Sequence, residues 1–255
     1  MIEKEKLDSM KTFGLLGRNI SYSFSSGYFK EKFDALNLKN HVYQNFDINK
    51  IENFQQLLSE NKKALKGMNV TIPYKEEILP FLDEIDEEAA SIGAVNTIKF
   101  LTNGDLKGYN TDVYGFQNSL EPLLEEQHQK ALILGTGGAS KAIAYALDKL
   151  HKNYLFVSRN PTTENQISYT DLTEEILLDN YLIINCTPLG TFPETNLCPD
   201  IPYHFITSKH LMYDLIYNPR VSSFLQKGKN QGAKIKNGLE MLQLQAEKSW
   251  EIWNR

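Results

Sequence analysis

Apolar positions along the first half of the chain follow two periods, one typical of strands and one typical of helices. Short apolar or alternating runs predict strands, and apolar residues spaced three or four apart predict helices. Strands are expected at 13–17, 42–46, 66–72, 94–100 and 105–110. Helices are expected at 27–36, 51–59, 75–82 and 86–92. The turn signal Asn103-Gly104 indicates that the last two strands form a hairpin.

The second half, from Asp112, alternates strands and helices more regularly. Helices are expected at 113–126, 139–150 and 239–253, and strands at 130–134, 154–157, 181–185 and 211–215. The strand at 130–134 (KALIL) is almost entirely apolar, which is typical of a parallel sheet covered on both faces. Strand, glycine turn, helix and strand follow one another here as a βαβ unit. The pattern therefore predicts an α/β fold, with linkers near 110–113 and 229–237.

Composition narrows the class of protein. The 255 residues suit one large domain or two ordinary ones. A net charge of −5 without a basic block argues against a nucleic-acid partner. No apolar run reaches the roughly 18 residues of a membrane span, and the charged start, 1–10, resembles no secretory signal.

Cysteine and histidine usage points to a reduced compartment and to no metal. Cys186 and Cys198 are too few to cross-link a chain of this size, so a cytoplasmic location is the simplest expectation. They are also too few for a structural zinc site. None of the five histidines stands in a metal-like spacing.

A glycine cluster, Gly135-Thr136-Gly137-Gly138-Ala139-Ser140, follows the strand at 130–134 and opens the next helix. Glycines there permit a tight turn and let backbone N–H groups approach a pyrophosphate at the helix N-terminus. Ser140 replaces the usual third glycine. We interpret the cluster as a dinucleotide-binding loop; the alternative is an ordinary turn between strand and helix.

The end of the next strand indicates which dinucleotide is bound. NAD-binding proteins place an acid there to hold the ribose 2′-hydroxyl. This chain has Ser158-Arg159-Asn160 and no acid. An arginine fork suits a 2′-phosphate, so NADP is favoured over NAD. The alternative is that Arg159 is a solvated surface residue.

Polar residues gather near the expected strand ends of the first half. They supply hydroxyl, amide, ammonium and carboxylate groups, which suit a small polyhydroxy carboxylate and the transfer of a proton. Each has a simpler reading on its own, since a lysine after a strand is usually solvated and Asn or Asp near a turn usually bends or caps the chain. The residues are Ser23, Ser25, Asn69, Thr71, Lys75, Asn96 and 110–112.

A series of motifs resembles the shikimate dehydrogenase family, in family order from residue 14 to residue 245. The similar segments are NVTIPYKE at 69–76, GAVNT at 93–97, GYNTD at 108–112, the glycine loop at 135–139, NCTPLG at 185–190, DLIYNP at 214–219 and GLEML with Gln245 at 238–245. The first family motif is altered, because Tyr22 replaces a histidine and Asn19 and Ser26 replace prolines, while Ser23 and Ser25 remain.

The resemblance implies a role for each matching residue. Lys75 and Asp112 would form the catalytic pair. The substrate would be bound by Ser23, Ser25, Asn69, Thr71, Lys75, Asn96, Asp112, Tyr217 and Gln245. The cofactor NADP would be bound by Gly135, Thr136, Gly137, Gly138, Ala139, Ser158, Arg159, Asn160, Thr187, Leu215 and Gly238.

The resemblance also implies an architecture and a reaction. We expect an N-terminal α/β substrate domain (1–111), a doubly wound Rossmann domain for NADP (112–237), and a C-terminal helix (238–255) that returns to the first domain. The expected activity is reversible NADPH-dependent reduction of 3-dehydroshikimate to shikimate, in aromatic amino-acid and chorismate biosynthesis. Partners would be the small-molecule substrate and, at most, a second copy in a homodimer.

Two alternatives stay open at this point. A quinate or dual quinate/shikimate dehydrogenase shares the fold, although Ser23 and Arg159 favour shikimate and NADP. A non-catalytic NADP-binding paralogue would have no need of Lys75 and Asp112.

Overall fold

The computed structural model describes residues 10–20, 23–61 and 63–255. They form two compact units. Unit 1 holds the described residues up to Thr111 together with Ala246–Arg255, and unit 2 holds Asp112–Gln245. Tyr22 of the altered first motif and the charged start at 1–9 lie outside the described residues.

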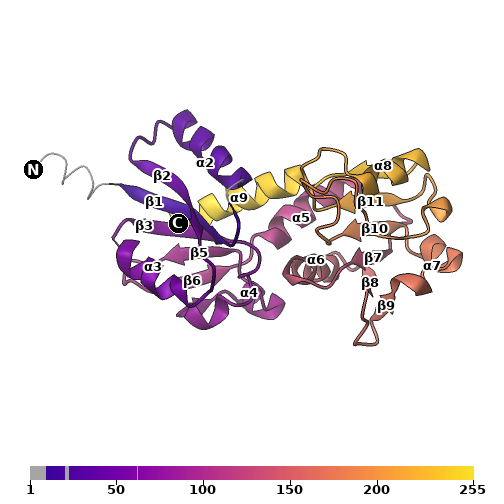
Figure 1. The fold of residues 1–255 in the computed structure, drawn as a ribbon, viewed down its shortest axis with the longest axis horizontal. Helices are drawn as coiled ribbons and strands as arrows, with labels where there is room; N and C mark the ends of the chain where they lie inside the picture. Colours follow the sequence, from indigo (N-terminus) through magenta and orange to yellow (C-terminus); the bar gives the residue numbers. More distant parts are fainter. Residues whose placement is uncertain (1–9, 21–22, 62) are drawn as a thin grey trace, which may run out of the picture. The chain divides into compact units, whose positions relative to one another are not determined.

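Unit 1 is built on a six-stranded mixed sheet in the order β2-β1-β3-β5-β6-β4, among the residues described (Figure 1). Its strands are β1 (Lys11–Gly17), β2 (His41–Asp47), β3 (Leu65–Val70), β4 (Glu84–Ile85), β5 (Thr97–Phe100) and β6 (Leu106–Tyr109). Strand β1 is parallel to both β2 and β3. Strands β5 and β6 form the predicted antiparallel hairpin.

Helices cover both faces of this sheet, because its strands carry apolar side chains on both sides. α3 (Asn53–Asn61) and α4 (Glu87–Ile92) pack with Leu16, Met68 and Ile98. On the other face, α2 (Phe24–Ala35) and the end of α9 (Leu239–Asn254) pack with Phe13 and Leu15.

The helix expected at 75–82 is wrong. Turns occupy most of that range, and only a short 3-10 helix, η1 (Leu79–Phe81), forms. Pro80 has no N–H to donate, and its ring would clash with the carbonyl four residues earlier in an α-helix. Apolar spacing alone therefore overstated the helix.

Unit 2 has a six-stranded parallel sheet in the order β12-β11-β10-β7-β8-β9, within the described part of the chain. Its strands are β7 (Lys130–Leu134), β8 (Asn153–Ser158), β9 (Gln166–Ser168), β10 (Leu182–Asn185), β11 (Leu211–Asp214) and β12 (Lys234–Lys236). Read from β9, the strands follow the doubly wound order 3-2-1-4-5-6. This confirms the predicted Rossmann fold.

The helices of unit 2 complete its layers. They are α5 (Asp112–Leu120), α6 (Gly138–Lys149), α7 (Glu174–Asp179), α8 (Ser223–Asn230) and the start of α9, with the short 3-10 helices η2 (Glu121–Leu123), η3 (Tyr169–Asp171) and η4 (Tyr203–Phe205). The helix expected at 113–126 ends at Leu120, because Pro122 cannot continue an α-helix.

Helix α9 belongs to both units, since the division falls after Gln245 rather than before Gly238. In unit 1, Trp253 lies against Gly67 of β3, where an added Cβ would come within 2.4 Å of the indole ring. The indole nitrogen of Trp253 donates to the carbonyl of Ile98 at 3.0 Å. The end of α9 is thus fixed to the sheet of unit 1.

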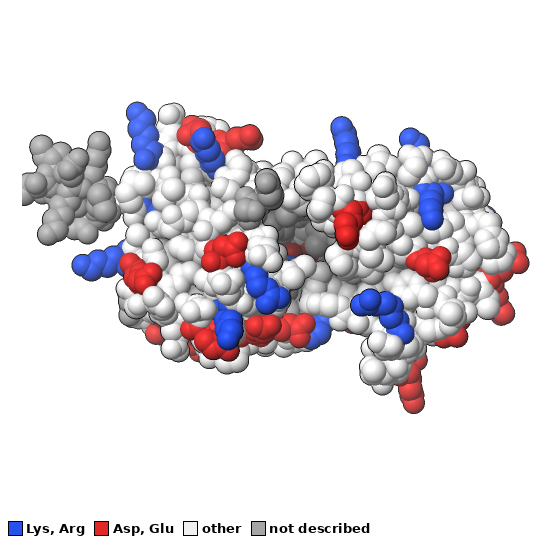
Figure 2. Space-filling model, viewed as in Figure 1, with Lys and Arg blue, Asp and Glu red and all other residues white. Residues whose placement is uncertain are grey.

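Charged side chains show no broad single-sign field on the face drawn in Figure 2, where basic and acidic residues are interspersed. This face offers no extended basic surface for a phosphate backbone. In the described part of the chain, no helix combines the length and the apolar character needed to cross a bilayer.

Two buried histidines of unit 2 connect loops in their neutral form. His128 accepts from the N–H of Glu125 at Nδ1 (2.9 Å), and its Nε2 lies 3.1 Å from the carbonyl of Lys209. His210 accepts from the N–H of Thr207 (3.0 Å), and its Nε2 lies 3.0 Å from the carbonyl of Leu177. Each ring therefore carries its proton on Nε2. Burial lowers the pKa of both histidines below the ordinary 6.5.

We expect the His210→Asn variant to lose part of the pH dependence of stability. A lowered folded-state pKa means that wild-type unfolding free energy falls as pH drops below about 6.5. Asn retains an acceptor for Thr207 but does not titrate. Urea unfolding at about pH 7.5 and pH 5.5 should show a smaller pH effect in the variant, and an equal effect in both proteins would contradict the assignment.

Asp214 affects the pH dependence of unfolding free energy in the opposite direction, and it is present in both the wild type and the His210→Asn variant. Burial raises the pKa of Asp214 to about 6, so its contribution to unfolding free energy rises as pH falls through that value. The contribution of Asp214 therefore cancels when the pH effect on unfolding free energy is compared between wild type and His210→Asn.

Candidate functional site

The candidate substrate residues of unit 1 meet at one edge of its sheet. Strands β1, β3 and β6 run in one direction and β5 runs in the other. The carboxyl ends of the three strands therefore lie beside the start of β5. Ser23 and Ser25 follow β1, Thr71 and Lys75 follow β3, and Asn96 precedes β5.

Ser23 is the residue before the first turn of α2. Its backbone is extended (φ −73°, ψ 127°), and its side chain makes no capping hydrogen bond. Its hydroxyl oxygen is buried and has no hydrogen-bond partner among the described residues. A buried hydroxyl beside a helix N-terminus suits one oxygen of a bound carboxylate, because unpaired buried polar groups are costly and helix N-termini favour anions.

Asn69 is bound by Tyr43, a residue that sequence reasoning missed. The Tyr43 hydroxyl donates to Asn69 Oδ1 at 2.9 Å. Burial raises the pKa of Tyr43, so this hydroxyl stays neutral and remains a donor. Asn69 Nδ2 lies 3.1 Å from Thr97 Oγ1 and 2.9 Å from Ser249 Oγ. The oxygen and the nitrogen of the Asn69 side chain therefore both form hydrogen bonds within unit 1.

Thr71 and Lys75 lie in the turn after β3. The Thr71 N–H donates to the carbonyl of Leu16 at 2.9 Å, which holds the turn beside the end of β1. The carbonyl of Lys75 accepts from the N–H of Val95 at 2.8 Å. These bonds hold the backbone of Lys75 close to the segment that carries Asn96, and the Lys75 side chain is half-buried.

The loop after β1 is fixed by Asp47, a second residue without a sequence signal. Its carboxylate accepts from the N–H groups of Asn19 (2.9 Å) and Ile20 (3.1 Å). Asn19 has a left-handed backbone (φ 58°), which Asn tolerates better than most residues. Asp47 thus constrains the segment in which Asn19 replaces a proline.

In unit 2 the glycine loop lies where the strand order reverses. The chain leaves β7 toward β8 through α6 on one side, and it leaves β10 toward β11 through a segment with the short helix η4 on the other. Ligands of such sheets bind outside the carboxyl ends of the strands at this point. Gly135 follows β7 with φ 103°, and an added Cβ would lie 3.2 Å from the Thr187 methyl group. The predicted cofactor residues Gly135 and Thr187 are therefore neighbours.

The start of α6 has the features of a phosphate-binding helix N-terminus. Gly137 is the capping residue, and an added Cβ there would meet nothing within 4 Å, so the backbone is open to a ligand. The first N–H groups of a helix lack partners within that helix. Ser140 replaces the third glycine without obstruction, because it is buried and its hydroxyl donates to the carbonyl of Gly137 at 2.6 Å.

Ser158, Arg159 and Asn160 lie at the carboxyl end of β8, next in the sheet to β7. The Ser158 hydroxyl accepts from the N–H of Asn160 at 3.2 Å, forming a short turn. Arg159 is exposed at the tip of this turn. Its guanidinium is accessible at the position where a ribose 2′-phosphate is recognised in this fold.

A buried carboxylate, Asp214, organises the loops after β10 and β11. It accepts from Asn185 Nδ2 (3.0 Å), from the N–H of Ile216 (3.0 Å) and from the hydroxyl of Ser222. Asn185 Oδ1 in turn accepts from the N–H (3.0 Å) and the hydroxyl (2.7 Å) of Thr187. One carboxylate thus fixes the backbone around both Thr187 and Leu215.

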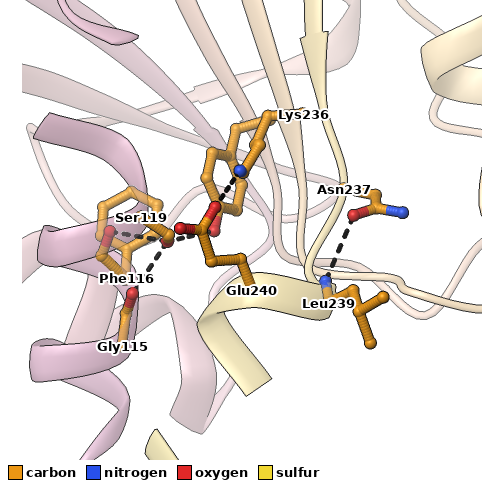
Figure 3. A network of polar contacts seen from close by, with 8 residues as sticks. Gly115, Phe116, Ser119, Lys236, Asn237, Leu239 and Glu240 are labelled. Atoms are coloured by element: carbon orange, nitrogen blue, oxygen red, sulfur yellow. Dashed lines mark hydrogen bonds and ion pairs between the residues drawn. The ribbon is translucent and has the colours of Figure 1, made fainter. Parts of the chain in front are cut away.

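Leu215 and Gly238 are brought together. An added Cβ on Gly238 would lie 2.1 Å from the carbonyl oxygen of Leu215, so only glycine permits this approach. Figure 3 shows the polar contacts beside Gly238: Lys236 pairs with Glu240, and Asn237 Oδ1 accepts from the N–H of Leu239 at 3.3 Å. These bonds fix the start of α9.

Figure 3 also shows Ser119 of α5, whose hydroxyl lies 2.8 Å from the carbonyl of Gly115 and 3.0 Å from that of Phe116. Because both carbonyls only accept, the hydroxyl of Tyr213 on β11 donates to Ser119, at 2.7 Å. This bond holds α5 against the sheet of unit 2.

Asp112, Tyr217 and Gln245 are the candidate substrate residues of unit 2. Asp112 is the first residue of α5 and is buried. Gln245 Nε2 donates to the carbonyl of Leu242 at 3.0 Å. Gly115 lets α5 approach α9, since an added Cβ would lie 2.4 Å from the carbonyl of Met241. Tyr217 is half-buried in the segment after β11.

Comparison with known proteins identifies similar chains over nearly the whole length. Residues 15–98 match the family described as "Shikimate dehydrogenase substrate binding domain". A shikimate dehydrogenase (NADP(+)) from Clostridium beijerinckii is 39% identical over 254 residues, covering 96% of this chain and 92% of that protein.

Two solved structures are similar in fold and sequence. The crystal structure of shikimate dehydrogenase from Aquifex aeolicus matches with a TM-score of 0.84 and 35% identity, covering 96% of this chain and 92% of that one. The Thermus thermophilus shikimate 5-dehydrogenase, solved with NADP(H) and shikimate, matches with a TM-score of 0.84 and 30% identity, covering 96% of this chain and 93% of that one.

Proposed function

This chain belongs to the shikimate dehydrogenase family, and we propose that it catalyses the reversible NADPH-dependent reduction of 3-dehydroshikimate to shikimate. The observation that carries the proposal is the buried hydroxyl of Ser23 at the N-terminus of α2, which lacks a partner among the described residues and suits the carboxylate of this substrate. The step belongs to aromatic amino-acid biosynthesis.

The residues of unit 2 fit NADP(H). Gly137 leaves open space above the backbone, Gly135 makes the tight turn, and Arg159 is accessible at the end of β8. No acid stands at that strand end to repel a 2′-phosphate. Gly135 to Ala139 would cradle the pyrophosphate, Ser158 to Asn160 would hold the 2′-phosphate, and Thr187, Leu215 and Gly238 would line the rest of the cofactor site.

The reaction needs one hydride and one proton. When bound, NADPH supplies the hydride to C3 of the substrate. Lys75 donates the proton to the C3 oxygen as negative charge develops there, and Asp112 orients the Lys75 ammonium. General acid catalysis of this kind contributes typically about 10²–10⁴-fold. In the direction of shikimate oxidation, Lys75 accepts the same proton.

The remaining candidate residues bind or position the substrate. Ser23 and Ser25 hold the carboxylate. The ring hydroxyls are met by Thr71, Asn96, Asp112, Tyr217 and Gln245. The side-chain amide of Asn69 forms hydrogen bonds with other groups of unit 1. Asn69 therefore acts as a positioning residue behind the residues that contact the substrate.

The proposal also covers the function of each domain, the cellular location and the oligomeric state. Residues 1–111 with the end of α9 bind the substrate, and residues 112–237 bind NADP. Cys186 and Cys198 are free thiols, which suits a cytoplasmic enzyme. The partner is a small molecule and neither nucleic acid nor membrane, and the protein is a monomer or homodimer; light scattering on the purified chain measures which.

We expect Ser23→Ala to raise KM for shikimate about tenfold, because a hydrogen bond to a charged group contributes about 1.5 kcal/mol. Thermal stability should change little, since the Ser23 hydroxyl makes no capping bond in the protein. Ser25→Ala is the matched comparison. It should also raise KM for shikimate, because the Ser25 hydroxyl is assigned to the same carboxylate. An unchanged KM in Ser23→Ala would contradict the carboxylate assignment.

Product analysis tests the proposed function. Purified protein incubated with shikimate and NADP⁺ should form 3-dehydroshikimate and NADPH in equal amounts, measured by mass spectrometry and absorbance. NADPH formation without 3-dehydroshikimate would contradict the assigned position of oxidation. Absence of both products would contradict the activity.

A further inference from the structure

Three buried hydroxyl groups cluster beneath Asn96 in unit 1. They belong to Thr97, Thr111 and Ser249, none of which is more than 1% exposed. Ser249 Oγ, on α9, lies 2.8 Å from Thr97 Oγ1 and 3.2 Å from Thr111 Oγ1. Thr97 Oγ1 and Thr111 Oγ1 lie 3.2 Å apart. The C-terminal helix thus supplies a polar group to the sheet edge where the candidate substrate residues lie.

These hydroxyls fix the orientation of the Asn96 amide. Asn96 Oδ1 lies within hydrogen-bond distance of Thr97 Oγ1 (3.0 Å), Thr111 Oγ1 (3.1 Å) and the N–H of Thr111 (2.8 Å). The backbone N–H of Thr111 can only donate, so it excludes the flipped amide, which would point an N–H group at it. The Asn96 amide is thus held with its oxygen on these donors and its nitrogen on the opposite side.

Each hydroxyl has one proton, which sets the direction of the network. Thr97 and Thr111 direct their protons to Asn96 Oδ1, and the Ser249 hydroxyl lies within hydrogen-bond distance of both threonine oxygens. Ser249 accepts from Asn69 Nδ2, at 2.9 Å. The amide of Asn69 is held in that orientation because Tyr43 donates to its Oδ1. Ser249 therefore connects Asn69 to the threonines that orient Asn96.

We propose that Ser249 is a positioning residue for substrate recognition, because it supports the threonine hydroxyls that hold Asn96 with its amide nitrogen toward a substrate hydroxyl oxygen. The inference rests on the proposed function. Loss of the Ser249 hydroxyl should weaken binding of the substrate but not of NADP(H). The reason is that the whole network lies in unit 1, whereas the glycine loop lies in unit 2.

The experiment compares Ser249→Ala with wild type in steady-state oxidation of shikimate. We expect KM for shikimate to rise about fivefold, the usual size of a lost hydrogen bond, with KM for NADP⁺ within about twofold of wild type. Calorimetry should show the same loss in shikimate affinity. Ser91→Ala is the matched control, since Ser91 is an exposed helical serine whose hydroxyl donates to the carbonyl of Glu87 at 2.9 Å; it should leave both KM values unchanged.

Paired substitutions of Thr97 keep the inference testable if Ser249→Ala does not fold. Thr97→Ser keeps the hydroxyl and should retain KM for shikimate near wild type, whereas Thr97→Val keeps the volume and should raise it. A lower Tm with both KM values unchanged would show a merely structural role and overturn the inference alone. Wild-type protein without shikimate turnover would overturn the proposed function as well.

Discussion

Replacing Lys75 with alanine should lower kcat for shikimate oxidation at least a hundredfold, because the variant lacks the group that exchanges the proton with the C3 oxygen. KM for NADP⁺ should stay within about twofold, since Lys75 lies in unit 1 and the glycine loop lies in unit 2. Steady-state rates with each substrate varied in turn measure both quantities.

The control for this experiment is Lys66→Ala. Lys66 also carries an ammonium group on β3 but is exposed and belongs to no motif, so its loss should leave kcat unchanged. Near-wild-type turnover of Lys75→Ala would exclude Lys75 from the proton step. Equal losses in both variants would indicate a general effect of positive charge in this part of unit 1.

Replacing Arg159 with glutamine should lower kcat/KM for NADP⁺ roughly thirtyfold, because a charge-assisted pair with phosphate contributes about 2 kcal/mol. The value for NAD⁺, which has no 2′-phosphate, should change less than about threefold. The preference for NADP⁺ should therefore fall by about the same factor as kcat/KM, measured from initial rates with both cofactors.

Arg220→Gln is the matched control for Arg159. Arg220 is exposed on unit 2 and has no assigned role, so its substitution should leave cofactor preference unchanged. An unchanged preference in Arg159→Gln would mean that its guanidinium is a solvated surface group. A parallel loss with NADP⁺ and NAD⁺ would point to damage of the turn after β8.

Much of the fold could be predicted from the sequence because periodicity and turn chemistry agree locally. The strand at β7, its glycine turn and helix α6 were predicted within one residue of their observed bounds. The expected linker at 229–237 is wrong in part, since it contains strand β12, and helices α7 and α8 were not predicted. Two other misses share a specific cause. Pro80 and Pro122 each lie inside an apolar pattern of helical spacing and have no N–H for an α-helix. No α-helix forms around Pro80, and α5 ends before Pro122.

The candidate site was predictable only where motifs name residues. Tyr43 and Ser249 lie outside every motif, and their importance comes from contacts across 26 and 180 positions to Asn69. No local pattern signals such a contact. Asn69 itself stands in a motif, which made it a candidate substrate-binding residue. Only the structure shows that its side-chain amide forms hydrogen bonds within unit 1.

Initial rates of reduced-cofactor formation, with NADP⁺ and NAD⁺ each paired with shikimate and with quinate, are the decisive measurement of the proposed activity. We expect rapid NADPH formation from shikimate and much slower rates with the other three pairs. Preference for quinate or for NAD⁺ would contradict the roles given to Ser23 or Arg159. No turnover with any pair, alongside measurable NADPH binding, would contradict the catalytic assignment and favour a non-catalytic NADP-binding protein.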